Sequence, residues 1–307
     1  MANYQLTENF NTFFKNINPG DEFEKIASRE YKRVKDLIED TDGLASGLSP
    51  KCFLQGSYKQ TTAIYSINDV DIVALCKLWY PGSGSGNNWS RDEIFDTVAG
   101  PLLNDDDYSG KVKYNQSSMC IKLDLDIKVE ILPVVYKQGN NDPQVEPFYL
   151  YRPETSSWEV GYARRHQLLL SEKNQDDRTQ RNFIPAIKIF KHIRSRLVLE
   201  NVSFHIECLL YSLPDSLFIG SPADYIDNLL NYIASTSADD WYSKMINTPC
   251  GERDIFVESE WNKTNWLKFH ETIGDLSLLV KSANESDNER TAIQFWQMVL
   301  GDNFFPN

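Results

Sequence analysis

Hydrophobic residues recur at helical spacing in the first forty positions of the chain. The apolar residues between positions 5 and 17 lie three or four apart, which predicts an amphipathic helix. Pro19 and Gly20 end that helix, and the same spacing then predicts a longer helix over 23–38. A turn segment follows over 41–48. We interpret both apolar stripes as faces that pack into a core.

The pattern becomes strand-like between residues 54 and 136. The apolar run VDIVAL at 70–75 predicts a buried strand, and 117–123 predicts another. Residues 124–136 are predicted to form one long strand, in which charged and apolar side chains alternate from 124 to 131 and give one charged face. Pro133 marks where the pairing of this strand weakens. Ser90 is expected to cap a helix through residue 98. The Gly/Ser-rich stretch 81–90 is interpreted as a flexible linker or lid.

The second half of the chain has a different character. Residues 143–160 are rich in Pro, Tyr and polar residues, which we interpret as the crossing into a second domain. Helical periodicity then dominates over 164–170, 182–199, 225–234, 264–281 and 289–300. The sequence therefore predicts an α+β fold, with a mixed sheet-and-helix lobe over 1–160 and an all-helical lobe over 161–307.

Candidate chemistry concentrates in residues 54–75. Asp69 and Asp71 lie two apart on the predicted strand, so both side chains project from the same face. Two carboxylates held this close repel each other unless a cation lies between them, and Mg²⁺ suits such oxygen-rich sites. Gly56 and Ser57, just upstream, offer backbone N–H groups and a hydroxyl that can hold phosphate oxygens. The combination indicates a nucleotide-processing site.

Composition narrows the choice of partners. The net charge of −13 should repel nucleic acid backbones over most of the surface, so long nucleic acid is not an expected partner. The five cysteines are scattered and indicate neither a zinc site nor a disulfide framework, which favours a reducing cytosol. We find no signal peptide and no apolar run long enough to span a membrane. We therefore expect a cytoplasmic protein that does not bind membranes.

The spacing of these residues resembles a known superfamily. Gly-Ser followed, about a dozen residues later, by Asp-x-Asp on a strand resembles the DNA polymerase β-type nucleotidyltransferases. The fuller form GSYKQTTAI…DVDIV is similar to the cyclic GMP-AMP synthase and dinucleotide cyclase-like enzymes (CD-NTases) of bacterial antiphage (CBASS) systems. Thr61 departs from the family pattern, because many relatives carry Gly there. The resemblance implies a nucleotidyltransferase lobe, a helical lobe and an active site in the cleft between them.

The resemblance also implies a third metal carboxylate on a later strand. In the family this residue is usually an Asp three positions before a Pro, and Glu130 in VEILP stands at that position here. Asp126, predicted on the same strand face, is the alternative, whereas Asp124 is interpreted as a solvated residue. We favour Glu130, which gives a catalytic and metal-binding set of Asp69, Asp71 and Glu130 for Mg²⁺, with Mn²⁺ as a substitute.

The helical lobe supplies further nucleotide-binding candidates through the resemblance. The segments KIFKHIR and VSFHIE are similar to the family's KLMKYL…SSYHV arrangement. The similarity implies that Lys191 and Ser203 hold the triphosphate and that Phe204 stacks on a base. On composition alone, these residues would be a solvated basic ridge, a helix N-cap and a core residue. The full predicted nucleotide-binding set is Gln55, Gly56, Ser57, Lys188, Lys191, Ser203 and Phe204.

The implied activity is Mg²⁺-dependent condensation of NTPs, ATP among them, into a cyclic di- or trinucleotide with release of pyrophosphate. Two ions about 3.5–4 Å apart would activate a ribose hydroxyl and stabilise the leaving group. The expected partners are an effector that responds to the product and an operon-encoded regulator. Alternatives are tRNA tailing, which fits poorly with the net charge of −13, AMP transfer to a protein, and a non-catalytic nucleotide-binding module.

Overall fold

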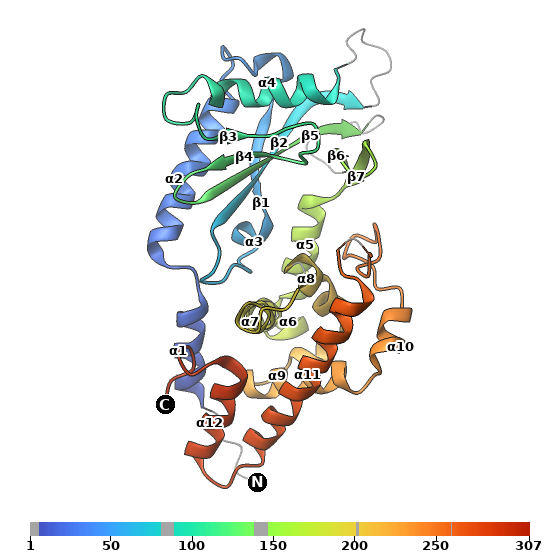
Figure 1. The fold of residues 1–307 in the computed structure, drawn as a ribbon. Helices are drawn as coiled ribbons and strands as arrows, with labels where there is room; N and C mark the ends of the chain where they lie inside the picture. The colour runs from blue at the N-terminus through green and yellow to red at the C-terminus, as the bar shows by residue number, and fades with distance from the viewer. Residues whose placement is uncertain (1–5, 81–88, 138–146, 201–202, 259) are drawn as a thin grey trace. The chain divides into compact units, whose positions relative to one another are not determined.

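The computed structural model describes residues 6–80, 89–137, 147–200, 203–258 and 260–307 (Figure 1). The chain forms two compact units. The sheet unit contains residues 19–61 and 67–167, and the helical unit contains residues 1–18, 62–66 and 168–307. The chain therefore passes from one unit to the other after residues 18, 61, 66 and 167. Most of the predicted linker over 81–90 lies outside the described residues.

The sheet unit is built on one mixed seven-stranded sheet. Its strands are β1 (Lys51–Gln55), β2 (Asp69–Tyr80), β3 (Val112–Lys113), β4 (Ile121–Asp124), β5 (Lys128–Lys137), β6 (Phe148–Arg152) and β7 (Ser157–Gly161). The main order is β1-β2-β5-β4-β3, with β6 on the later part of β5 and β7 on β6. β2 and β5 run parallel, and the other neighbouring strands pair antiparallel.

Helices cover one face of this sheet. The unit contains α2 (Asp21–Ile38), the 3₁₀ turn η1 (Ser46–Leu48), the short α3 (Gly56–Lys59) and α4 (Arg91–Leu103). Figure 1 shows α2 and α4 lying along the sheet, and their apolar residues share a buried core with Val70 and Ile72 of β2. Since side chains alternate along a strand, Asp69 and Asp71 lie on the opposite face, in line with the buried Val73.

The helical unit surrounds a separate core that is rich in aromatic side chains. Its elements are α1 (Thr7–Ile17), most of α5 (Ala163–Lys173), α6 (Asp176–Thr179), α7 (Phe183–Arg196), α8 (Ser203–Ser212), η2 (Asp215–Phe218), α9 (Pro222–Ala234), α10 (Ala238–Ser243), α11 (Lys263–Asn284) and α12 (Glu289–Leu300). Trp261, Trp266 and Phe269 are nearly inaccessible, and their rings contact one another edge-to-face or stacked. Aromatic contacts of this kind stabilise a core beyond the area that they bury.

The predicted fold class is confirmed, because a mixed sheet with helices precedes an all-helical part. The division between the two parts differs in detail from the prediction. Residues 148–161 form the strands β6 and β7 rather than a domain crossing, and the compact sheet unit ends at Gln167 rather than at residue 160. The helix α1 belongs to the helical unit, where its Phe10 and Phe13 are fully buried.

One strand prediction is wrong. Residues 124–136 are not a single strand, because β4 ends at Asp124, a bend follows over Leu125–Ile127, and β5 begins at Lys128. Asp124 and Lys128 pair across the hairpin that the bend closes. A hairpin preserves the alternation of charged and apolar residues, so the pattern could not separate it from a long strand. Asp residues are depleted in strands and favoured in turns, which explains where the chain bends.

Candidate active site

Asp71 and Glu130 lie side by side on neighbouring parallel strands. The register of β2 and β5 pairs Asp71 with Glu130 and Asp69 with Lys128. Register partners project from the same face of a sheet, and Asp69 shares that face because it lies two residues before Asp71. The side chains of all three acidic residues are partly buried. The sheet therefore brings the predicted carboxylates to one face, away from α2 and α4.

Gly56 is pressed against the Asp71 carboxylate. Gln55, the last residue of β1, pairs with Asp71 in the register, and Gly56 follows with φ of 69°. A Cβ at Gly56 would overlap the Asp71 Oδ2 atom, so only glycine fits both the left-handed backbone and the close approach. The predicted Gly-Ser turn is the first turn of α3, which places Ser57 next to this contact.

Glu130 is held by two side chains of the β4 edge. Lys122 Nζ lies 2.8 Å from Glu130 Oε1, and the Cys120 thiol lies 3.6 Å from Oε2. The hydrogen bond to Glu130 raises the pKa of Lys122, which keeps that amine protonated. Burial, followed by the charge of Glu130, raises the pKa of Cys120 to about 12, so its sulfur stays a protonated thiol. The negative charge of Glu130 is thus partly balanced from β4.

The carboxylate donors fit a hard divalent cation. Mg²⁺ and Mn²⁺ prefer carboxylate oxygens, and Asp69, Asp71 and Glu130 offer them on one sheet face. Within the described ranges, no three His, Cys, Asp or Glu side chains are gathered closely enough to form a ligand cluster. Glu130 Oε1 bonds to Lys122, so this lysine would share the Glu130 carboxylate with a cation or give it up.

The structure separates Asp126 from Glu130. Asp126 is exposed in the bend between β4 and β5, so the expectation that it shares the strand face of Glu130 is wrong. Asp124 is exposed on β4 and bonds to Lys113, in agreement with a solvated role. The hairpin therefore favours Glu130 over Asp126 as the third metal carboxylate.

Lys191 is buried in the helical unit. Its amine donates to Glu207 Oε1 at 2.5 Å and to Thr62 Oγ1 at 2.9 Å. Lys191 is only 3% exposed and Glu207 only 4%, so a phosphate could reach this amine only if the buried contacts broke. The role of Lys191 in triphosphate binding stays a prediction.

The other predicted residues of the helical unit lie on α7 and α8. Lys188 donates to Asn18 Oδ1 at 2.8 Å. Ser203 begins α8 and accepts a bond of 3.3 Å from Arg194 of α7. Phe204 is partly buried, and its ring contacts the His205 ring edge-on. All of them belong to the helical unit, whereas the carboxylates and Gln55–Ser57 belong to the sheet unit.

Sequence reasoning missed the partners of two predicted residues. Lys122 could have been found, because strand alternation places it on the charged side of β4, opposite Glu130 in the register. Glu207 had a weaker signal, since it lies on the next helix, 16 residues after Lys191. No sequence signal pointed to Thr62, because 129 residues separate it from Lys191.

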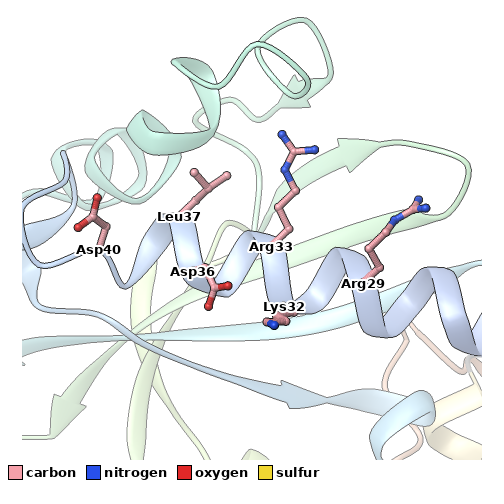
Figure 2. A pocket seen from close by; sticks show the side chains of 6 residues that line it. All are labelled: Arg29, Lys32, Arg33, Asp36, Leu37 and Asp40. Carbon is pink, nitrogen blue, oxygen red and sulfur yellow. The ribbon is translucent and has the colours of Figure 1, made fainter.

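A groove of about 410 Å³ along α2 carries charged residues of both signs (Figure 2). It is lined by Arg29, Lys32, Arg33, Asp36, Leu37 and Asp40. Arg33 forms ion pairs with Asp105 and Asp107, and Arg29 pairs with Glu30. Figure 2 shows the six lining side chains spaced along the helix rather than converging on one point. We assign no chemistry to this groove.

Family profiles match nearly the whole chain. The Second Messenger Oligonucleotide or Dinucleotide Synthetase domain matches residues 4–174. The cGAS/DncV-like nucleotidyltransferase C-terminal helical domain matches residues 170–277. The first match covers the residues that form the sheet and the carboxylate face, and the second covers most of the helical unit. None of the helices described in the structure is long and apolar enough to cross a membrane.

Individual relatives point the same way. A cyclic UMP-AMP synthase of Rhodothermus marinus is 24% identical over 252 residues, which cover 74% of this chain and 84% of the relative. The structure of R. marinus CdnE c-UMP-AMP synthase with Apcpp and Upnpp has a TM-score of 0.67 at 20% identity, covering 90% and 96% of the two chains. The dinucleotide cyclase DncV of Vibrio cholerae, solved with GTP and 5MTHFGLU2, has a TM-score of 0.75 at 12% identity, covering 98% and 96%.

Proposed function

This chain belongs to the Second Messenger Oligonucleotide or Dinucleotide Synthetase family, and we propose that it condenses NTPs, ATP among them, into a cyclic di- or trinucleotide. It is an enzyme of the nucleotidyltransferase class, as its named relatives are cyclic nucleotide synthases. The observation that carries the proposal is the pairing of Asp71 with Glu130 beside Gly56, which puts carboxylates next to a Gly-Ser helix start. The family match favours cyclic products over tRNA tailing or AMP transfer to a protein.

In the proposed mechanism the sheet unit holds the reacting phosphates. Backbone N–H groups of Gly56 and Ser57, with the Ser57 hydroxyl and Gln55, bind the β- and γ-phosphates. Asp69, Asp71 and Glu130 would hold Mg²⁺ or Mn²⁺. The bound ion would lower the pKa of the attacking ribose hydroxyl and stabilise charge on the α-phosphate and leaving pyrophosphate. Positioning and charge compensation suffice, because phosphoryl transfer requires little covalent chemistry from a protein.

The helical unit completes nucleotide binding in this proposal. Ser203 donates to a phosphate oxygen, Phe204 stacks on a base, and Lys188 adds positive charge. A partly buried aromatic ring can exchange a protein contact for a base, since every base has a flat π-face. Attack of a remaining ribose hydroxyl on the α-phosphate of the remaining triphosphate forms the last phosphodiester bond. This step breaks the bond between the α- and β-phosphates, closes the ring and releases another pyrophosphate.

We place this activity in bacterial antiphage signalling in the cytoplasm. A cyclic nucleotide acts only through a protein that binds it, so an effector that recognises the product is the expected downstream partner. An operon-encoded regulator is the expected upstream partner. The matched family, named for second-messenger synthesis, supports this assignment.

The direct test is incubation of the purified protein with all four NTPs and Mg²⁺ or Mn²⁺, followed by mass spectrometry of the small products. We expect a cyclic di- or trinucleotide from the wild type and none from the Asp69→Asn, Asp71→Asn double variant. Asp124→Asn is the matched control, because Asp124 is an exposed carboxylate on β4 that bonds to Lys113. Nucleotides transferred only to RNA or protein would contradict the proposal.

A further inference from the structure

Residues 62–66 leave the sheet unit and pack within the helical unit before the chain returns at Ile67. Ala63 and Ile64 are 5% and 6% exposed. The Tyr65 N–H donates to the Ile17 carbonyl at 2.7 Å, and the Tyr65 ring contacts the Phe304 ring at 4.7 Å between centroids. We call residues 62–66 the crossing segment. Its middle is buried, and Tyr65 contacts residues of the helical unit.

Three polar side chains form a closed hydrogen-bonded triangle at the start of the crossing segment. Lys191 Nζ donates to Glu207 Oε1 and Thr62 Oγ1, and Thr62 Oγ1 donates to Glu207 Oε1 at 2.6 Å. Thr62 is fully buried, and the two charged residues are nearly so. Buried charges are tolerated only when they are paired and hydrogen-bonded, so these groups hold one another in place. We call this triangle the Thr62 anchor.

The crossing segment connects the two sequence motifs of the proposed site. Ser57 lies five residues before Thr62, and Asp69 lies three residues after Ser66. Thr61, where the chain leaves the sheet unit, has φ of 59°, a left-handed conformation that is strained for a β-branched residue. Such strain persists only where the surrounding structure fixes it, and the adjacent Thr62 anchor provides that restraint.

We infer that Thr62, Lys191 and Glu207 are positioning residues for the transfer reaction. Fixing Thr62 restrains the chain that leads back to Ser57 and forward to Asp69. This inference rests on the proposed function, and it gives the buried amine of Lys191 a role that requires no contact with phosphate. A misplacement of about 1 Å can lower catalysis by about 10²-fold, so loss of the anchor should lower kcat more than it changes KM.

The test compares Thr62→Val with Thr62→Ser and with a matched control. Thr62→Val removes the hydroxyl at nearly constant volume, whereas Thr62→Ser keeps it. Thr179→Val is the control, because Thr179 is also fully buried in the helical unit and its hydroxyl donates to the Lys173 carbonyl at 2.7 Å. The readouts are kcat and KM for NTPs, the urea midpoint, and hydrogen–deuterium exchange of the crossing segment.

We expect Thr62→Val to lower kcat by about tenfold to 10²-fold with KM within about twofold. Exchange in the crossing segment should accelerate. Thr62→Ser should keep kcat and the exchange rate of the crossing segment close to those of the wild type. Thr179→Val should lose stability without losing kcat. Unchanged exchange in Thr62→Val, or unchanged kcat despite faster exchange, would overturn the inference.

Lys191→Met separates positioning from phosphate binding. We expect faster exchange in the crossing segment and a lower kcat, as in Thr62→Val. A raised KM with unchanged kcat and unchanged exchange would assign Lys191 to the nucleotide and overturn its positioning role. If the wild type made no nucleotide product, the proposed function would fail instead, and exchange would still decide whether the anchor holds the segment.

Discussion

Gly56 links the backbone conformation of α3 to the position of the Asp71 carboxylate, which we propose as a metal ligand. Its positive φ and its contact with Asp71 each require the absence of a Cβ. The sequence indicated a phosphate-binding role for this glycine, but it gave no sign that Asp71 packs against it. The structure therefore adds a second reason why the Gly-Ser pair and the Asp-x-Asp pair occur together.

Replacement of Gly56 tests this link. In Gly56→Ala, the new methyl group must push the Asp71 carboxylate away or displace α3. We expect a loss of at least about 10²-fold in kcat, together with weaker Mn²⁺ binding measured by electron paramagnetic resonance. Gly110, which has open space around its Cα, provides the control Gly110→Ala. Full activity in Gly56→Ala would contradict the close packing.

The backbone conformation of Thr61 is one that favours glycine. Relatives often carry Gly where this chain has Thr61, and φ here is 59°. Glycine adopts that conformation without strain, whereas a β-branched residue does not. We expect Thr61→Gly to raise the free energy of unfolding by about 0.5–1 kcal/mol, because relief of strain exceeds the added entropy of the unfolded chain.

Urea denaturation checks the Thr61 prediction. The variant also loses the hydrogen bond of the Thr61 hydroxyl to the Gln60 carbonyl, which is exposed and contributes little. Thr61→Ala is the comparison, since it removes the branched side chain but keeps a Cβ in the left-handed region. If Thr61→Gly unfolded at a lower urea concentration than the wild type, the prediction that the substitution relieves strain would be wrong.

The β4–β5 hairpin places Glu130 and Asp126 in different surroundings. Glu130 lies inside β5, in register with Asp71, whereas Asp126 lies in the exposed bend. We therefore expect Glu130→Gln to lower product formation by at least about 10²-fold, because it removes a charge that compensates the metal. Asp126→Asn should leave the rate within about twofold. Steady-state kinetics with NTPs and Mg²⁺ gives both values.

The opposite result would assign the third carboxylate to Asp126. Suppose that Asp126→Asn abolished activity and that Glu130→Gln left it unchanged. Asp126 would then be the third carboxylate, and it would have to reach the site from the bend. Mn²⁺ titration of both variants supplies a readout that does not depend on turnover. Weaker Mn²⁺ binding in Glu130→Gln alone is the result expected from the register of β2 and β5.

Sequence patterns predicted the elements that are determined by residues close together in the chain. Ser90 caps α4, as the sequence predicted, and forms a capping box with Glu93; the helix continues to Leu103, beyond the predicted residue 98. The strands β6 and β7 were missed because they are short, and their pairing partners are set by tertiary structure rather than by periodicity. The spacing of Asp69 and Asp71 correctly predicted a shared face. The burial of Lys191 could not be predicted, because it depends on Thr62 and Glu207 from distant parts of the chain.

An acidic residue of the helical unit is predicted to make the stability of the molecule depend on pH. Glu260 of the helical unit accepts a bond of 2.5 Å from Arg253 and lies 2.8 Å from His205 Nε2. The neighbouring His205 and Arg253 side chains lower the pKa of Glu260 to about 2. A depressed pKa stabilises the folded state above the unfolded-state value of 4.5, and this contribution is lost as the pH falls toward 2.

Acid unfolding of Glu260→Gln tests that contribution. The wild type should be more stable than the variant at neutral pH, and the difference should shrink between about pH 5 and pH 2. Urea midpoints across this range can be monitored by tryptophan fluorescence, to which Trp261 and Trp266 of the helical core contribute. A difference that stayed constant over the range would show that the Glu260 charge does not stabilise the fold.

The stoichiometry of pyrophosphate release tests the central claim, that two or three NTPs are joined into a closed ring. Each phosphodiester bond releases one pyrophosphate, so a cyclic product releases one for every nucleotide that it contains. A linear dinucleotide would release one for every two nucleotides and would keep a terminal triphosphate. We predict equal amounts of pyrophosphate and incorporated nucleotide, in a product that resists phosphatase. Fewer pyrophosphates than incorporated nucleotides, with a phosphatase-sensitive product, would contradict ring closure.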